Sequence, residues 1–331
     1  MGRNPLPALA VGAMAVMLAP AAGAQSAYTL VKTIDLPGDT GGHGDWTTFD
    51  SATGTVWLSQ SPDHNVVVID AASQSIKGVI PGIEEGNGIG LTPKYAFLAD
   101  AKGNTVVVVD KATLQKVATL HPEGQAPDTV NYIAKADEVF VNTASNDMTV
   151  YSATAPFKEI DHFRLQPDPA KDGPDIALYV ARTDRIYQPD DNVVDVIDPH
   201  SRKIVAVWRP GIQGSAKPMV FDGKTGHLLL GTTDKDMLVL DSRSGKVVAT
   251  IPVQGSVDET AIDETARRAF VGDKDGLIEV IDFDSNTVVD RIPSEKNVHT
   301  LTVDPKTHAV FVYRNESNKV DVFEPLKTAA K

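Results

Sequence analysis

The chain of 331 residues contains no cysteine, and its 44 acidic residues outnumber its 31 basic residues, which gives a net charge of −13. Without cysteine, disulfide bonds, thiolate catalysis, cysteine–zinc sites and iron–sulfur clusters are all excluded. Because the acidic excess is spread along the whole chain, nucleic acid and anionic lipid are disfavoured as partners, since both require clustered lysine and arginine.

Helical periodicity is also scarce. Outside the first 24 residues no apolar pattern repeats every 3.6 residues over a sustained stretch, which argues against barrels and doubly wound folds whose helices alternate with strands. The sequence likewise has no G-x-S-x-G elbow, P-loop or dinucleotide fingerprint. With 42% hydrophobic and 23% charged residues, the composition is that of a globular protein, which disfavours disorder and a coiled coil.

Residues 1–24 have the features of a secretory signal peptide. Arg3 precedes an uncharged apolar stretch, and Ala22-Gly23-Ala24 fits the small-x-small cleavage pattern. A membrane anchor is the alternative, but the proline and glycine content and the short apolar run make a poor spanning helix. We therefore expect residues 25–331 to form a single periplasmic or secreted domain without a membrane span.

A β-type tetrad that ends in an acidic or small residue recurs seven times. The final residues of the seven copies are Asp70, Asp110, Ser152, Asp198, Asp241, Asp282 and Glu324. The steps between them are 40, 42, 46, 43, 41 and 42 residues, a period typical of propeller blades. Each unit also carries four short β-rich segments bounded by turn residues. We predict an all-β, seven-bladed β-propeller with four-stranded blades.

The two ends of the chain complement each other. Six tetrads are followed by an outer segment such as Val117–Leu120, but the seventh is followed only by Pro325 and a short polar tail. The mature N-terminus supplies Val31-Lys32-Thr33-Ile34, which has the outer-strand pattern without a tetrad before it. We expect this strand to complete the last blade, to bury Val31 and Ile34, and to remove an exposed sheet edge.

Hairpins in several units carry a family resemblance. The clearest copy reads Phe97-Leu98-Ala99-Asp100, then Gly103-Asn104-Thr105-Val106 and Val109-Asp110; a second combines Phe311-Val312 with Ser317-Asn318 and Val320. These segments resemble the YVTN repeat of YncE-like seven-bladed propellers. The resemblance covers the mature chain and implies the fold and a non-catalytic binding role. Because the motif residues are mostly turn and core residues, it is nearly silent on chemistry.

One polar position recurs at the start of every inner segment. The residues five positions before the end of the inner segments are Asp45, Asn87, Asp128, Asp175, Lys217, Asp258 and His299. In a propeller these positions surround the central channel, so we expect them to form a ligand-binding ring at its mouth. The alternative interpretation is that these Asp and Asn residues only cap loop backbones.

Units six, seven and one become neighbours once the ring closes, and they concentrate His and carboxylate side chains. Asp45, Asp258 and His299 are the candidate ligands of a divalent metal, with His43 or Glu259 as a base that moves a proton. This mixed donor set suits Zn, Mn, Fe or Cu. The other six histidines lack ligand spacing and are expected at the surface: His64, His121, His162, His200, His227 and His308.

Two functions are therefore open. The first is an exported, monomeric binding scaffold that takes a protein or small-molecule ligand at its channel mouth. The second is a lactonase-like hydrolase or lyase in which a channel-bound metal polarises a carbonyl. No cofactor is certain from the sequence, and a divalent metal is the one that the second function requires.

Overall fold

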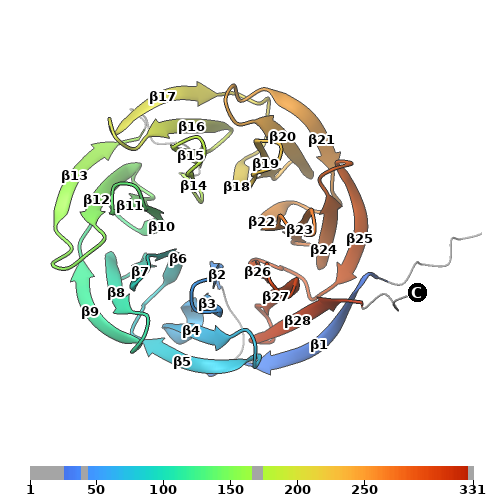
Figure 1. Cartoon of the computed structure of the whole chain (residues 1–331), viewed down its shortest axis with the longest axis horizontal. Helices are drawn as coiled ribbons and strands as arrows, with labels where there is room; N and C mark the ends of the chain where they lie inside the picture. Colours follow the sequence, from blue (N-terminus) through green and yellow to red (C-terminus); the bar gives the residue numbers. More distant parts are fainter. Residues whose placement is uncertain (1–25, 39–43, 166–173, 327–331) are drawn as a thin grey trace, which may run out of the picture.

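The computed structural model describes residues 26–38, 44–165 and 174–326. Within these ranges the chain forms seven four-stranded antiparallel sheets, arranged as the blades of a ring (Figure 1). The described ranges contain no α-helix and one 3-10 turn, η1 (Ser61–Asp63). The prediction of an all-β, seven-bladed propeller with four-stranded blades is confirmed.

Each blade runs from an innermost strand beside the central channel to an outermost strand at the rim of the ring. Blade 1 is β2 (Thr47–Asp50), β3 (Thr55–Gln60), β4 (Asn65–Asp70) and β5 (Ser75–Pro81); blade 2 is β6 (Gly86–Leu91), β7 (Tyr95–Asp100), β8 (Thr105–Asp110) and β9 (Gln115–Leu120). Blade 3 is β10 (Pro127–Ile133), β11 (Glu138–Thr143), β12 (Asp147–Ser152) and β13 (Glu159–Arg164); blade 4 is β14 (Leu178–Val180), β15 (Arg185–Asp190), β16 (Val193–Asp198) and β17 (Lys203–Trp208). Blade 5 is β18 (Ala216–Asp222), β19 (His227–Thr232), β20 (Asp236–Asp241) and β21 (Val247–Pro252); blade 6 is β22 (Val257–Asp263), β23 (Arg268–Asp273), β24 (Leu277–Asp282) and β25 (Thr287–Pro293). Blade 7 is β26 (Leu301–Asp304), β27 (Ala309–Arg314), β28 (Lys319–Pro325) and β1 (Tyr28–Asp35).

The two middle strands of each blade form most of the core. In β4, Val66, Val67, Val68 and Ile69 are all fully buried. Such continuous apolar runs are expected where both faces of a sheet are covered, and here the covers are the neighbouring blades. Each apolar cluster accordingly spans a blade junction, such as the one that joins Val56 and Phe311 of blades 1 and 7.

The chain closes its ring through the predicted pairing of its ends. Strand β1 runs antiparallel to β28, with Ile34 opposite Val320. Ile34 is buried as predicted, but the expected burial of Val31 is wrong, because this side chain is 43% exposed. A β-bulge between Leu30 and Lys32 inserts Val31 as an extra residue, which interrupts the inward–outward alternation. Tyr28 fills the second buried position and packs edge-on against Phe270.

Contacts between a buried carboxylate and a basic side chain cross three blade junctions. In each, the aspartate that ends an inner strand contacts a basic side chain of the next blade. The pairs are Asp50 with Lys111 Nζ (2.7 Å), Asp222 with Arg267 Nη1 (2.5 Å), and Asp263 with His308 Nδ1 (2.6 Å). His308, which the sequence places at the surface, is 35% exposed and contacts the fully buried Asp263.

The predicted signal peptide, residues 1–24, lies outside the described residues, so its cleavage and the periplasmic or secreted location stay predictions. None of the helical segments in the described ranges has the length and hydropathy needed to traverse a lipid bilayer.

Candidate functional site at the channel mouth

The seven predicted ring residues occupy equivalent places in the seven blades. Four lie within inner strands, namely Asn87 in β6, Asp128 in β10, Lys217 in β18 and Asp258 in β22. The other three, Asp45, Asp175 and His299, lie just before β2, β14 and β26. Because the inner strands surround the central channel (Figure 1), all seven lie at one end of that channel.

A cavity of about 290 Å³ opens at this end, and it defines the channel-mouth site. Its polar lining consists of Asp45, Asp128, Asp175, Lys217, Asp258, Glu259, Lys274 and His299. Six of the seven ring residues are thus brought together. The seventh, Asn87, stands beside the cavity and donates a hydrogen bond from Nδ2 to Asp128 Oδ1 at 3.3 Å.

Lys274 is a residue of the site that the sequence pattern did not indicate. It lies in the turn Asp273–Gly276, which has the pattern of a solvated hairpin. In the structure its Nζ lies 3.6 Å from Asp258 Oδ2, because this turn of blade 6 reaches over the start of its own inner strand. A basic residue in a turn between two acidic residues is too common a pattern to have signalled this contact.

The arc over blades 6, 7 and 1 is connected through His299. Its Nδ1 lies 3.3 Å from Asp258 Oδ2, and its Nε2 lies 3.4 Å from Asp45 Oδ1. An imidazole that carries hydrogen on both nitrogens donates to both carboxylates at once. His299 therefore links the carboxylates of blades 6 and 1 across the start of blade 7.

The opposite side of the mouth holds a second ion pair. Lys217 Nζ lies 2.9 Å from Asp175 Oδ2, and each side chain is 23% exposed. Burial lowers the pKa of Lys217, but the attraction of Asp175 outweighs it and leaves the pKa raised. Lys217 therefore remains a fixed positive charge among the carboxylates.

Two carboxyl groups of the site have raised pKa values. Burial raises the pKa of Asp128 well above its ordinary value, and the charges of Asp175 and Asp45 raise it further. Burial likewise raises the pKa of Glu259, although Glu259 Oε1 accepts a hydrogen bond from the Thr260 N–H at 2.9 Å. When several carboxylates share a space with little water, their mutual repulsion favours the protonated, neutral form of some of these carboxyl groups.

The close approach of blades 2 and 3 places Asn87 next to Asp128. Gly88 follows Asn87 in β6, and a Cβ atom at this position would lie 2.4 Å from the carbonyl oxygen of Asp128. Only glycine allows the two inner strands to come this close without displacing the backbone.

A second cavity, of about 360 Å³, lies within the channel and shares the lining residues Ile176 and Glu259 with the mouth. Its apolar lining includes Trp46, Phe49 and Leu301. The site is thus charged at its mouth and more apolar behind Glu259.

The geometry does not assemble a metal site within the described ranges, where no three His, Asp or Glu side chains are grouped to hold an ion. Asp45 and Asp258 contact different nitrogens of His299, and these nitrogens point in diverging directions. Three-fold coordination of one ion would require this arrangement to change. His43 lies outside the described residues, so the metal, its ligands and the base His43 or Glu259 stay predictions.

No protein-family model and no curated relative matches the chain. Among solved structures, the chain is similar to hydrazine synthase from Kuenenia stuttgartiensis, with a TM-score of 0.78 and 15% sequence identity over 88% of this chain and 98% of that one. At this identity the likeness shows the β-propeller fold alone.

Proposed function

We propose that this protein is an exported binding scaffold, and that its channel mouth receives a ligand that carries a cationic group. The observation that carries the proposal is the composition of the mouth, where five carboxyl groups face two lysines and one histidine. A cation bound there would relieve the repulsion among the carboxylates. The resemblance to YncE-like YVTN propellers supports a non-catalytic role, and the leader-like residues 1–24 support export.

The size of the mouth limits the ligand. A volume of about 290 Å³ lies at the lower end of the range of small-molecule sites, roughly 300–1,000 Å³. A small organic amine fits this space, and so does one lysine or arginine side chain of a protein partner. Both present the same chemistry to the carboxylates.

Binding of a cation should be coupled to proton release. Asp128 and Glu259 have raised pKa values, and a positive ligand favours their ionised forms. The affinity should therefore increase with pH as these two groups lose their protons.

Calorimetric titration of residues 25–331 with putrescine and with arginine methyl ester, at pH 6 and pH 8, tests the proposal. We expect saturable binding that is tighter at pH 8, and at least a tenfold loss of affinity in the variant Asp45→Asn/Asp258→Asn. Glu316→Gln, which removes an exposed carboxylate of blade 7, is the matched control. Failure of both amines to bind, or equal binding by the double variant, would contradict the proposal.

The metal-dependent hydrolase is the second candidate, because Asp45, His299 and Asp258 share one arc and Glu259 beside them can supply a proton. Metal analysis of the purified protein after incubation with Zn²⁺ or Mn²⁺ separates the two functions. A stoichiometric metal that is lost in His299→Ala would favour the hydrolase. A chain that takes up no metal would support the scaffold.

A further inference from the structure

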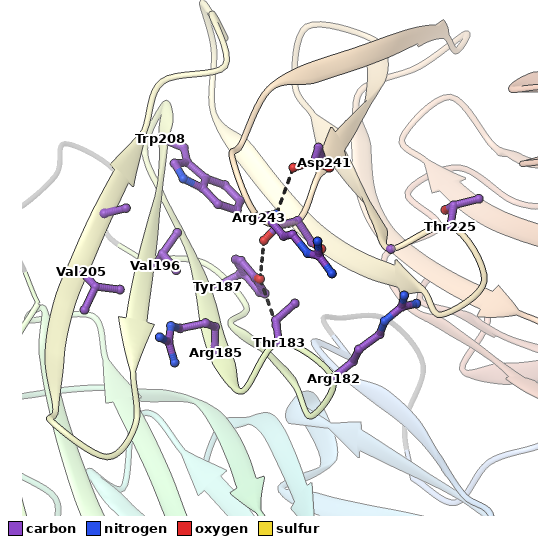
Figure 2. A pocket seen from close by; sticks show the side chains of 13 residues that line it. Arg182, Thr183, Arg185, Tyr187, Val196, Val205, Trp208, Thr225, Asp241 and Arg243 are labelled. Atoms are coloured by element: carbon purple, nitrogen blue, oxygen red, sulfur yellow. Dashed lines mark hydrogen bonds between the residues drawn. The ribbon is translucent and has the colours of Figure 1, made fainter.

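A cavity of about 570 Å³ lies between blades 4 and 5. Side chains from β15, β16 and β17 line it on one side, and the turns before β19 and after β20 line it on the other (Figure 2). The inner strands begin at the channel mouth and end at the turns that include Arg182 and Thr225. This blade 4–5 cavity therefore lies toward the opposite end of the propeller.

The cavity is positively charged in a strongly acidic chain. Arg182, Arg185 and Arg243 line it, together with one carboxylate, Asp241. Three guanidinium groups around one space depart from the net charge of −13 that the whole sequence carries. The local field therefore attracts an anion that the rest of the surface repels.

Two of the three arginines form no ion pair with a described carboxylate. Arg185 is compensated by Asp198, whose Oδ2 lies 3.3 Å from Nη1. Arg182 donates to the carbonyl oxygen of Gly223 but forms no ion pair with the described residues. The guanidinium of Arg243 has neither a hydrogen bond nor an ion pair within the described ranges, and both Arg182 and Arg243 are exposed.

The one carboxylate of the lining, Asp241, accepts hydrogen bonds from residues of its own turn. Asp241 Oδ1 accepts hydrogen bonds from the Ser244 hydroxyl at 2.7 Å and from the Ser244 N–H at 2.9 Å. These bonds lower the pKa of Asp241 and hold its side chain in the turn. Asp241 thus reduces the positive field without blocking Arg182 or Arg243.

Two packed aromatic side chains lie beneath the cavity. The rings of Tyr187 and Trp208 lie 5.3 Å apart at an angle of 36°. The Tyr187 hydroxyl donates to the carbonyl oxygen of Ser242 at 2.7 Å (Figure 2). Gly245, with a φ of +69°, lies against the indole, and a Cβ there would lie 2.2 Å from Trp208 Cδ2. Tyr187 is fully buried and Trp208 is 9% exposed, so the two rings form a rigid base beneath the cavity. Val205, which is 51% exposed, is the main apolar side chain that a ligand can reach.

We propose that the blade 4–5 cavity binds a small carboxylate that carries an apolar group. The carboxylate would be held by Arg182 and Arg243, because guanidinium groups form charge-assisted, bidentate hydrogen bonds with this group. The apolar group would lie against the exposed side chain of Val205 and the small part of Trp208 that remains exposed, because burial of apolar surface is favourable. The volume is within the usual range of small-molecule sites, roughly 300–1,000 Å³. This site shares no residue with the channel mouth and selects the opposite charge.

Salicylate is a suitable probe, with the uncharged salicylamide as its matched analogue. We expect calorimetry to show one saturable salicylate site per chain and at least tenfold weaker binding of salicylamide. Arg182→Gln/Arg243→Gln should lose at least tenfold in affinity. Arg209→Gln, which removes an exposed arginine of the same region outside the cavity lining, should bind as the unaltered chain does.

Three results would overturn the proposal: equal binding of salicylate and salicylamide, unchanged binding in the double variant, or inorganic phosphate binding as tightly as salicylate. The last result would show that the apolar lining contributes nothing. Arg243→Gln alone provides a second variant that removes no described contact of the guanidinium, so the test does not depend on the folding of the double variant.

Discussion

Buried carboxyl groups of this propeller respond to burial in opposite ways, depending on whether a cation lies beside them. Burial alone would raise the pKa of Asp222, but Arg267, Thr225 and a backbone N–H lower it to about 2. Glu259 is buried to a similar degree and has no ion pair with the described residues, so its pKa is raised. Asp222 therefore stabilises a blade junction as a carboxylate, whereas Glu259 favours its protonated form beside the channel mouth.

Arg267→Met should destabilise the protein by about 3–5 kcal/mol, because it leaves the carboxylate of Asp222 buried without its partner. Urea denaturation at pH 7 measures the change. Lys224→Met is the matched control, since the Lys224 side chain is 66% exposed and its Nζ pairs with the half-exposed Asp284; its backbone N–H, which donates to Asp222, is unchanged by the substitution. An exposed pair of this kind contributes about 0–1 kcal/mol. Equal effects of the two substitutions would contradict the argument.

The Asp222–Arg267 pair also predicts an acid dependence. Because the folded pKa of about 2 lies below the ordinary value of 3.8, the contribution is complete above pH 4 and is lost as the pH falls toward 2. The shift corresponds to about 2 kcal/mol. Stability measured from pH 6 to pH 2 should fall more steeply in the unaltered chain than in Asp222→Asn. Parallel curves would exclude this pair as a source of acid sensitivity.

Glu259→Gln should raise stability, and more so at pH 8 than at pH 4.5. The raised pKa means that the unfolded chain ionises this group first, so stability is lost as the pH rises above 4.5. Glutamine keeps an oxygen that can accept the Thr260 N–H but carries no charge. The difference in melting temperature between variant and unaltered chain should grow with pH, whereas Glu316→Gln should show no such trend. A difference that is constant with pH would be inconsistent with a raised pKa.

At the scale of the strand, the outer edge of every blade carries the same irregularity. Each outermost strand has one residue more than its partner at a β-bulge. The inserted residues are Val31, Lys77, Val117, Ile160, Val205, Val248 and Val289. Six of the seven are β-branched apolar residues that are 43–51% exposed. Bulges bend and twist an edge strand, which hinders pairing with another chain.

These inserted side chains should contribute little to stability. We expect Val248→Lys to change the free energy of unfolding by less than about 0.5 kcal/mol, as for other surface substitutions, because Lys77 already occupies the equivalent position. Ile251→Ala in the same strand should cost about 2–5 kcal/mol, since Ile251 is 1% exposed. Denaturant titration of both variants tests the assignment, and a large loss in Val248→Lys would refute it.

For the whole molecule, closure of the ring depends on a segment of about ten residues, 26–36, at the start of the described residues. Seven residue pairs join β1 to β28. The segment before β1 also reaches blade 6, where the Ser26 hydroxyl and the Ala27 N–H both donate to Asp290 Oδ2 at 2.7 Å. The N-terminal segment therefore links blades 6 and 7 and leaves no blade with three strands.

Deletion of residues 25–36 should open the ring. The loss includes burial of Tyr28, Ile34 and Leu36, at roughly 1.5–3 kcal/mol for each fully buried side chain, and backbone hydrogen bonds at about 1 kcal/mol each. This sum is comparable with a typical domain stability of about 5–15 kcal/mol. Calorimetry should show a large fall in melting temperature, whereas Val31→Thr should change it little. An unchanged melting temperature after the deletion would disprove closure by this strand.

The sequence by itself determined the number of blades, the four strands in each, the closing strand and the ring of polar residues, because these follow from local patterns repeated about every 42 residues. Tertiary structure alone decided what depends on register or on contacts between blades. The bulge that exposes Val31 is a property of strand pairing, and the reach of Lys274 to Asp258 depends on how a turn folds over its blade. Arg182 and Arg243 lie on consecutive blades and meet at one cavity only because those blades pack side by side.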